Sequence, residues 1–375
     1  MKYKLKEIGE IISGGTPSTK RSDFYATKGI GWITPKDLSN YHKKYICHGA
    51  RDISKIGLDN SSAKIMPPNS ILVSSRAPIG YVAMAEESLA TNQGFKSIIP
   101  DVSKVLPDYL YYLMLNSKSK LEQVASGSTF KEVSGKTMAN FEVDIPEIQK
   151  QKYIISLLNP IVKKIELNNQ INDNLLELLK SEFNHSVIDN NKKIPINKIF
   201  SVQSGFAFKS NDWSITGKNV VKIKDIENNT VSLNNLSKVN NVIQLKKAKK
   251  YYVTGGEIVI ALTGATLGKI GILPYNFEGY INQRVGLIYP KMSYTSVLGV
   301  LLQKEIRNKL ISLGHGSAQP NLSPKAVNEM IVNIDIEACR KYDVAFSSLF
   351  KKVIYNLNEN QVLTKLKMQL LDMYF

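Results

Sequence analysis

The chain has 375 residues, of which 43% are hydrophobic and 22% charged, a balance typical of globular proteins with two domains. It contains no apolar leader and no run of about 20 apolar residues, so we expect no membrane span and a cytoplasmic location. Two cysteines and four histidines are too few for a disulfide framework or a zinc site. The net charge of +17 favours a nucleic acid partner, although a lysine-rich genome would give the same excess.

Short β-like runs, broken by Gly, Pro, Asn and Asp, fill the first part of the chain. Residues 70–74 and 80–85 are predicted strands. Residues 107–116 are a predicted helix, since Leu110, Leu113 and Met114 share one face. We therefore expect a mixed α/β (α+β) globule over residues 1–145, the first predicted domain.

A long helix is predicted over residues 146–186. Positions spaced alternately by four and three form a seam of the kind found in coiled coils. Most of these positions are apolar, but two are asparagines: Ile154, Leu158, Ile161, Ile165, Asn168, Asn172, Leu175 and Leu179.

The second half of the chain repeats the first. Five blocks recur in the same order, at shifts between 187 and 191 residues, whereas the residues between the blocks differ widely. One scaffold therefore carries two different sets of loops, as expected of a protein that reads two different targets. The repeat predicts a second globule over residues 187–335, with a strand at 257–262 and a helix at 298–310. The matched blocks are 5–15 with 196–206, 32–38 with 220–226, 70–80 with 257–268, 91–94 with 281–284, and 127–134 with 316–323.

The second unit also ends in a predicted long helix, over residues 336–375, and its seam repeats that of the first helix. Adding 188 to 168 and 172 gives 356 and 360, so both asparagines fall on asparagines. Facing Asn pairs would satisfy the buried carboxamides and fix the register of the two helices; the alternative is a solvated polar gap. The seam positions are Phe346, Leu349, Val353, Asn356, Asn360, Leu363, Lys367 and Leu370.

The length of these helices has a geometrical consequence. About 35 residues at roughly 1.5 Å each span about 50 Å, which exceeds one turn of DNA at roughly 34 Å. The matched asparagines would meet in either a parallel or an antiparallel pair. If the pair is antiparallel, we expect it to act as a rigid spacer with one globule at each end.

Motifs for catalysis are missing from the sequence. Residues 264–270 imitate a phosphate-binding loop, but they are one residue short and lack the Ser or Thr that holds magnesium. A tight turn between strands explains these glycines better. We find no Asn/Asp-Pro-Pro-aromatic methyltransferase motif, no nuclease motif and no metal-ligand spacing, so the chain is not expected to be an enzyme.

Polar turns that recur in both halves carry the groups that DNA reading needs. Arg and Lys suit guanine, Asn and Gln suit adenine, and Lys, Ser and Thr suit phosphate. In the first half the candidates are Ser13, Thr16, Lys20, Arg21, Lys36, Ser75, Arg76, Asn92, Gln93, Thr129 and Lys131. In the second half they are Lys209, Lys222, Lys224, Thr263, Thr266, Gln283, Arg284, His315 and Gln319.

Two groups among these candidates have an alternative role. Asn92-Gln93 recurs as Asn282-Gln283, and residues shared by two different readers are expected to build the scaffold or contact the DNA backbone. Arg76 and Arg284 stand out in a lysine-rich chain, but an internal salt bridge would explain them equally well.

The order globule, long helix, globule, long helix resembles the specificity subunit of type I restriction–modification systems. The most similar stretches are residues 126–134, Asn92-Gln93-Gly94-Phe95 and Gln149-Lys150-Gln151. The second unit departs from this pattern at Ala338-Cys339-Arg340 and at Pro320. The resemblance covers the whole chain, with two target recognition domains and two conserved helical regions.

This resemblance implies a reader of double-stranded DNA without catalytic activity. Each domain would read one half of an asymmetric split sequence, and the helix pair would set the unread gap and dock two modification subunits. Those subunits would bind S-adenosylmethionine and methylate adenine, and a restriction subunit, where one exists, would hydrolyse ATP. The chain itself is expected to bind no cofactor. An adaptor that binds two protein partners is the alternative, which a salt titration of DNA binding would distinguish.

Overall fold

The structure is a computed structural model that describes residues 1–39, 41, 43–127, 131–314 and 321–375. The chain divides into two compact units. The first contains residues 1–163 and 364–375, and the second contains residues 164–363.

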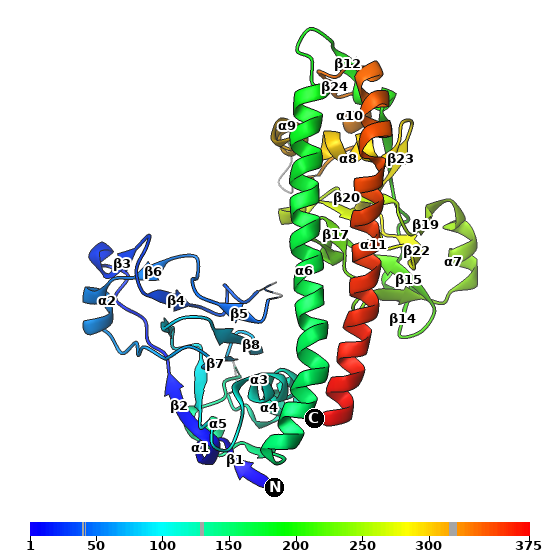
Figure 1. Cartoon of the computed structure of the whole chain (residues 1–375). Helices are drawn as coiled ribbons and strands as arrows, with labels where there is room; N and C mark the ends of the chain where they lie inside the picture. The colour runs from blue at the N-terminus through cyan, green and yellow to red at the C-terminus, as the bar shows by residue number, and fades with distance from the viewer. Residues whose placement is uncertain (40, 42, 128–130, 315–320) are drawn as a thin grey trace. The chain divides into compact units, whose positions relative to one another are not determined.

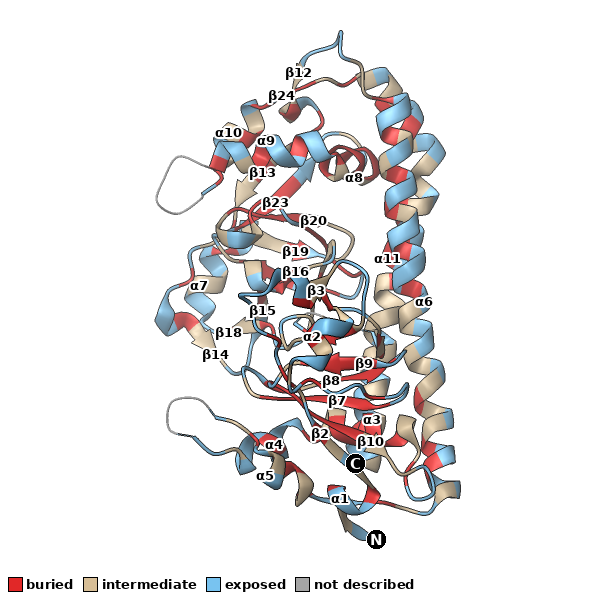
Figure 2. Cartoon of the chain, turned by 90° about the vertical axis from the view of Figure 1, so that its left-hand side faces the viewer, coloured by how far each residue is buried: buried red, intermediate tan, exposed pale blue. Residues whose placement is uncertain are grey.

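A five-stranded sheet forms the centre of the first globular domain. Its strand order is β2-β10-β7-β8-β5, from Gly9–Ser13, Lys96–Pro100, Ile71–Ser75, Ile79–Ala85 and Tyr45–Ile46. The strands of this sheet are largely buried (Figure 2), as expected for the nearly continuous apolar runs in β7 and β8. Three smaller pairs complete the β structure: β1 (Lys2–Lys4) with β11 (Glu142–Asp144), β3 (Tyr25–Ala26) with β6 (Asp52–Ile53), and β4 (Gly31–Ile33) with β9 (Leu89–Thr91).

The helices of the first domain are short and start at residues suited to helix starts. Pro107 occupies the first turn of α3, where its missing N–H costs nothing. The side chain of Ser134 accepts a hydrogen bond from the Thr137 amide at the start of α5. The helices are α1 (Leu5–Ile8), α2 (Lys55–Asp59), α3 (Pro107–Asn116), α4 (Lys118–Val124) and α5 (Gly135–Ala139), with a 3-10 turn, η1, at Ser22–Phe24.

The second domain has the same central sheet, extended by one strand. Its order is β13-β23-β20-β21-β17-β16, from Phe200–Ser204, Val285–Pro290, Ile258–Ala261, Ile270–Ile272, Thr230–Val231 and Ile226–Glu227. A second sheet has the order β14-β18-β15-β22-β19, from Trp213–Ser214, Ser237–Val239, Lys218–Val221, Glu278–Ile281 and Tyr252–Thr254. The other elements are β12 (Ile194–Pro195), β24 (Ile331–Val332), α7 (Val242–Lys247), α8 (Tyr294–Leu302), α9 (Lys304–Gly314), α10 (Pro324–Glu329), and 3-10 turns η2 (Ile196–Lys198), η3 (Ser210–Asp212), η4 (Ile223–Asp225), η5 (Lys249–Tyr251) and η6 (Gly264–Thr266).

Strand pairing confirms the predicted repeat of the fold. The parallel pair β4·β9 corresponds to β15·β22, and the parallel pair β5·β8 corresponds to β17·β21. The antiparallel pair β3·β6 corresponds to β14·β18, and β1·β11 corresponds to β12·β24. Within these pairs Ile33 faces Thr91 as Val221 faces Ile281, so the two domains agree in register as well as in topology.

One glycine recurs at the same position of both domains because a side chain there would collide with a neighbouring turn. A Cβ at Gly14 would lie 2.0 Å from the carbonyl oxygen of Asn92, and a Cβ at Gly205 would lie 2.4 Å from that of Ile281. Both glycines therefore allow the turn after β2 or β13 to approach the turn that follows β9 or β22.

One helix of the second domain was predicted wrongly. Residues 298–310 are not a single helix, because the backbone of Gln303 is extended and separates α8 from α9. These two helices correspond to α3 and α4 of the first domain, which Ser117 separates without an extended backbone.

The two long helices begin and end at equivalent positions of the repeat. Helix α6 (Ile148–Ser186) and helix α11 (Ile336–Tyr374) each have 39 residues, and both ends differ by the same shift of 188. In the second unit they lie side by side and run antiparallel (Figure 1), since Asn168 contacts Asn360 whereas the Tyr342 hydroxyl donates to the carbonyl of Leu179.

Candidate nucleic-acid interface

Backbone hydrogen bonds bring the predicted reading loops of the first domain together at one edge. The Gly15 amide donates to Thr91 (2.9 Å), the Asn92 amide to Ile33 (2.9 Å) and the Ser75 amide to Gly94 (2.7 Å). The Thr16 hydroxyl also contacts the side chain of Gln93. The loops at residues 13–16, 33–36, 74–76 and 91–94 thus lie next to one another, although up to about 80 residues separate them in the chain.

The second domain gathers the equivalent loops through the equivalent hydrogen bonds. The Phe206 amide donates to the carbonyl of Ile281 (3.0 Å), the Asn282 amide to that of Val221 (2.9 Å) and the Leu262 amide to that of Arg284 (2.9 Å). The backbone frame that holds the loops is therefore common to both domains, whereas the side chains that it presents differ.

Most of the predicted contact residues lie at the surface of these loops. Arg76, Asn92, Lys222, Thr263 and Thr266 are half-buried. Thr129, His315 and Gln319 lie outside the described residues. The exposed residues are Ser13, Thr16, Lys20, Arg21, Lys36, Gln93, Lys131, Lys209, Lys224, Gln283 and Arg284.

Ser75 is buried, which corrects its predicted role. Its hydroxyl donates to the carbonyl oxygen of Gly94 (3.1 Å), and its own carbonyl oxygen accepts from the amide of Val133 (3.0 Å). Ser75 therefore holds neighbouring loops in place and does not present its hydroxyl to a ligand.

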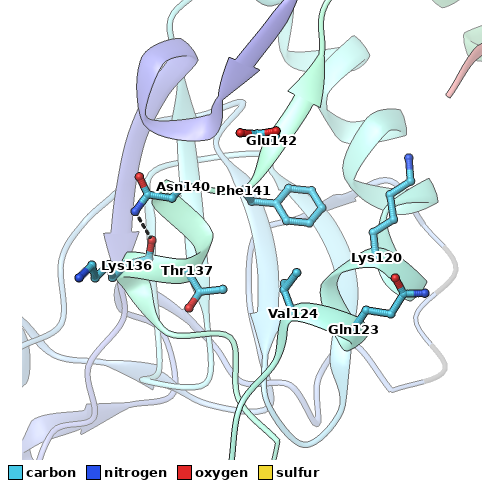
Figure 3. A pocket seen from close by; sticks show the side chains of 8 residues that line it. All are labelled: Lys120, Gln123, Val124, Lys136, Thr137, Asn140, Phe141 and Glu142. Atoms are coloured by element: carbon cyan, nitrogen blue, oxygen red, sulfur yellow. Dashed lines mark hydrogen bonds between the residues drawn. The ribbon is translucent and has the colours of Figure 1, made fainter.

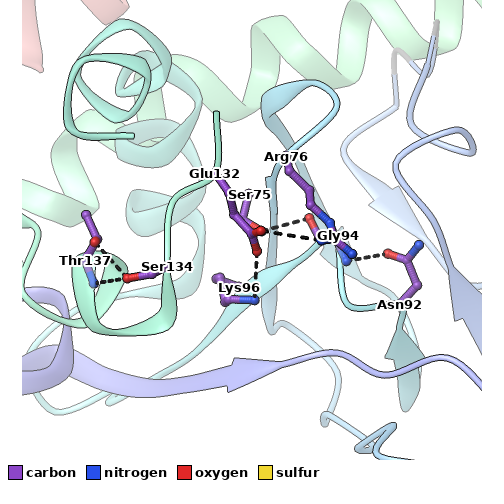
Figure 4. A network of polar contacts seen from close by, with 8 residues as sticks. All are labelled: Ser75, Arg76, Asn92, Gly94, Lys96, Glu132, Ser134 and Thr137. Atoms are coloured by element: carbon purple, nitrogen blue, oxygen red, sulfur yellow. Dashed lines mark hydrogen bonds and ion pairs between the residues drawn. The ribbon is translucent and has the colours of Figure 1, made fainter. Parts of the chain in front are cut away.

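Two arginines of the first domain already have carboxylate partners. Arg21 pairs with Asp23 at 2.7 Å, and this hydrogen bond holds the pKa of Asp23 below its ordinary value. Arg76 lies 3.4 Å from Glu132, which also lies 3.7 Å from Lys96 (Figure 4). The structure thus places Arg76 in the internal salt bridge that the sequence offered as its alternative role.

The shared asparagines form the same turn in both domains. The Asn92 carboxamide oxygen accepts from the Gly94 amide (2.9 Å), and that of Asn282 accepts from the Arg284 amide (3.4 Å). Both carboxamide oxygens therefore stabilise the turn in which they lie, which is the scaffold role expected of residues that recur in both domains.

The structure brings the four seam asparagines together in two pairs. Asn168 donates to Asn360 and Asn356 donates to Asn172, both at 2.9 Å. Asn168, Asn172 and Asn356 are buried. Asn168 also donates to Glu359 (2.6 Å), and this hydrogen bond is the main reason why the pKa of Glu359 is lowered.

Comparison with known proteins identifies the family. The family model described as "Type I restriction modification DNA specificity domain" matches twice, over residues 1–177 and 188–363. The chain belongs to this family. It is 31% identical, over 98% of its length and 90% of the relative, to the type I restriction enzyme MjaIX specificity subunit of Methanocaldococcus jannaschii.

Other relatives agree with this assignment. The type I restriction enzyme EcoR124I/EcoR124II specificity subunit of Escherichia coli is 28% identical over 48% of this chain and 45% of its own. The crystal structure of the type I restriction–modification S subunit from M. genitalium has the same fold, with a TM-score of 0.52 and 18% identity over 99% of this chain and 94% of that chain. The two globular domains described above are thus DNA specificity domains.

Both specificity domains place a cation over an aromatic ring, a feature that the sequence analysis missed. In the first, the Arg51 guanidinium carbon lies 4.1 Å from the centre of the Tyr25 ring and 5.8 Å from that of Trp32. In the second, Lys222 Nζ lies 3.4 Å from the ring centre of Trp213. Burial, and then the charge of Lys224, lower the pKa of Lys222. The rarity of arginine in this chain was the only sequence signal for Arg51.

A second missed feature is an open pocket between α4 and α5, of about 580 Å³ (Figure 3). Exposed Lys120 and Lys136 lie on its two sides, with Asn140 and Thr137 beside Lys136. The repeat places Lys309 and Lys325 at the corresponding positions of the second domain, and both are exposed. Exposed lysines at these positions are thus a feature that both domains share.

Metal sites and membrane spans were also sought. Within the described ranges, no three His, Cys, Asp or Glu side chains gather as a ligand set. No helix in the same part of the chain has the length and apolar character required to cross a bilayer.

Proposed function

We propose that the two specificity domains read the two halves of a bipartite, asymmetric DNA site. The observation that carries this proposal is the repeat: one strand topology and one frame of loop-to-loop hydrogen bonds support two different sets of exposed side chains. A single continuous target would need no second frame of the same shape with different contacts.

The helix pair acts as the spacer between the two half-sites. The two Asn pairs are 168 with 360 and 172 with 356, and the repeat shift of 188 converts the first pair into the second. A pseudo-two-fold axis therefore passes between the pairs. Sliding one helix would separate both pairs and leave buried carboxamides without partners, so the pairs fix the register that sets the gap.

Each long helix also carries exposed apolar residues outside the seam. Leu167, Ile171 and Leu178 follow one face of α6, and Tyr355 and Val362 follow the corresponding face of α11. Exposed apolar stripes mark protein interfaces. Because the shift of 188 relates Leu167 to Tyr355, we assign these two stripes to two copies of one partner, the modification subunit.

The chemistry of the system then belongs to the partners. Modification subunits supply S-adenosylmethionine and the methyl transfer to adenine, and a restriction subunit supplies ATP hydrolysis and cleavage. The chain itself contributes recognition and no catalysis, and it works in the cytoplasm, where the DNA lies.

The experiment that tests this proposal is co-expression of the chain with the modification subunit of its own system, followed by mapping of methylated adenines across a genome. We expect a motif of two short specified blocks separated by a gap of constant length. A single continuous motif, or methylation without sequence preference, would contradict the proposal.

A further inference from the structure

Cations over equivalent rings, Arg51 in the first domain and Lys222 in the second, are the feature that the proposed function leaves unused. Tyr25 and Trp213 each open the two-residue strand that follows a 3-10 turn, and they pair with Ile53 and Val239 respectively. The two rings therefore occupy the same position in the two folds.

The two domains supply their cations from different positions. Register places Ser237 of the second domain where Arg51 stands in the first, and Thr34 of the first where Lys222 stands in the second. The amides of Thr34 and Lys222 donate to Asp37 and Asp225 in the same way, at 2.7 and 2.8 Å, which supports this equivalence. A cation thus lies over the same ring in both domains, but it is a forked guanidinium in one and a single ammonium in the other.

Arg51 is available for a ligand, unlike the other arginines of the first domain. Arg21 and Arg76 pair with Asp23 and Glu132. Among the described residues, no carboxylate lies within ion-pair distance of the exposed Arg51. The neighbouring Asp52 is buried, and its oxygens accept from the Gly29 amide and contact His48.

The surroundings of Arg51 belong to the reading surface. The Tyr25 hydroxyl donates to the Pro17 carbonyl (2.8 Å), and the Trp32 indole donates to that of Gly15 (3.0 Å). Both rings are thereby tied to the loop that follows β2. Arg51 lines an open depression of about 690 Å³ together with Lys28, His48 and the buried Asp52, and the exposed cations Lys28 and Arg51 suit DNA.

We infer that Arg51, held over the Tyr25 ring, recognises a guanine through its O6 and N7 atoms in the half-site of the first domain. Lys222 on Trp213 contacts the corresponding base pair in the half-site of the second domain. Stacking fixes the plane of a guanidinium and leaves its outer N–H groups free for two parallel hydrogen bonds, which is the geometry that guanine requires. This inference rests on the proposed function, and it names the residues that distinguish the two half-sites.

The test uses the co-expressed complex and compares the methylation motifs of Arg51→Ala and Lys222→Met with that of the wild type. We expect Arg51→Ala to relax one guanine in one half-site and Lys222→Met to relax one position in the other. The lost discrimination should be roughly 5- to 150-fold, the usual range for one two-point base contact. Lys64→Ala, which removes an exposed charge from the first domain, is the matched control and should leave the motif unchanged.

A second variant separates base reading from a merely structural stack. Thr34→Lys combined with Arg51→Ser gives the first domain the arrangement of the second, with an ammonium near the ring and no guanidinium. We expect this variant to change the base preference at the same position of that half-site, whereas a merely structural stack would leave the preference unchanged. Thermal unfolding of each variant complex would show whether the fold is retained.

Three outcomes would overturn the inference. The Arg51→Ala motif could remain unchanged, both single variants could alter the same half-site, or methylation could fall equally at all sites with every specified base retained, as expected of a phosphate contact. A wild-type complex that gives no split motif would instead refute the proposed function, so the two failures are distinguishable.

Discussion

The two specificity domains share a topology, but they pack differently on the long helices. In the first unit a buried cation reaches the helix: Lys44 Nζ lies 2.5 Å from Asp108 and 2.9 Å from Asn159 of α6. Asn159 also accepts from the Tyr112 hydroxyl (2.7 Å) and donates to Asp108 (2.9 Å). The domain is thus attached to the helix by hydrogen bonds and an ion pair, whose strength depends on the orientation of the groups as well as on their distance.

In the second unit an aromatic side chain, Phe183, packs the domain against the long helices. The ring of Phe183 on α6 is fully buried, 5.0 Å from that of Tyr342 on α11, and it lies so close to Gly299 that a Cβ there would approach it to 2.3 Å. The repeat relates Gly299 to Tyr112, and Phe183 to Leu371. In the second unit the large side chain, Phe183, is on the helix and faces a glycine of the domain. In the first unit the large side chain, Tyr112, is on the domain, and the helix carries the smaller Leu371.

Removal of the Phe183 ring is the largest expected effect. Phe183→Ala should lower the free energy of unfolding by about 3–5 kcal/mol, since it combines lost burial with a cavity. Urea unfolding followed by circular dichroism would measure it. Leu313→Ala, at an exposed position of α9, is the control and should change stability by less than about 0.5 kcal/mol.

A double-mutant cycle makes the complementary packing testable. Gly299→Ala alone should destabilise through the clash with Phe183, and Phe183→Leu alone through lost volume. The two together should cost less than their sum, with a coupling of about 0.5–3 kcal/mol. Strict additivity would show that the two residues do not share one site.

Replacement of the buried cation of the first unit is the next largest effect. Lys44→Met should cost about 1–3 kcal/mol, because it leaves hydrogen-bonding groups of Asp108 and Asn159 unsatisfied near the core. The same measurement on Lys104→Met, which removes the exposed ion pair with Asp101, should give less than about 1 kcal/mol. Equal effects of the two substitutions would argue against a specific role for the Lys44 network.

The sequence was sufficient to predict the helix pair, because a coiled-coil seam has a fixed period and both asparagines recur at the same shift. It could not reveal the attachment of the domains. Lys44, Asp108 and Asn159 meet only through the fold, and nothing near Gly299 in the sequence announces the ring of Phe183. Helix α8 was also misplaced, since the apolar spacing continues through Gln303 where the backbone is extended.

The sequence could not distinguish Arg51 from Arg76 for a similar reason. Arg51 and Arg76 look alike in the sequence, as rare arginines beside short strands. Only the fold shows that Glu132, 56 residues away, pairs with Arg76, and that Tyr25 lies under Arg51. The recurring polar blocks, by contrast, identified loops that the fold brings together in each domain, because the residues shared by both domains build the backbone frame that holds them.

The helix pair, unlike the domain attachments, is the same in both repeats, and its test has two readouts. Asn356→Leu should cost about 1–3 kcal/mol, since it leaves the buried carboxamide of Asn172 without its donor. Leucine at all four asparagine positions should restore most of that stability but free the register, so the methylation motif should show more than one gap length.

The control for the helix pair is Asp173→Leu, at an exposed position of α6 off the apolar face of Leu167, Ile171 and Leu178, which should change neither stability nor gap. The register role would be refuted by a gap of constant length in the quadruple variant. Stability alone does not decide the question, because leucine pairs are compatible with several registers.

The smallest expected effect is a pH dependence of stability that arises from Asp225, in the turn 222–225. Asp225 is buried, and burial raises its pKa above the ordinary value of 3.8, so the folded state binds this proton more tightly than the unfolded state does. The contribution of this proton to stability is complete below the ordinary pKa and is lost as pH rises through the raised pKa. Asp225→Asn keeps an oxygen that can accept from the Lys222 amide but cannot titrate. Urea unfolding from about pH 3.5 upward should therefore show wild-type stability falling relative to the variant as pH rises. A constant difference across that range would mean that the pKa of Asp225 is not raised in the folded state.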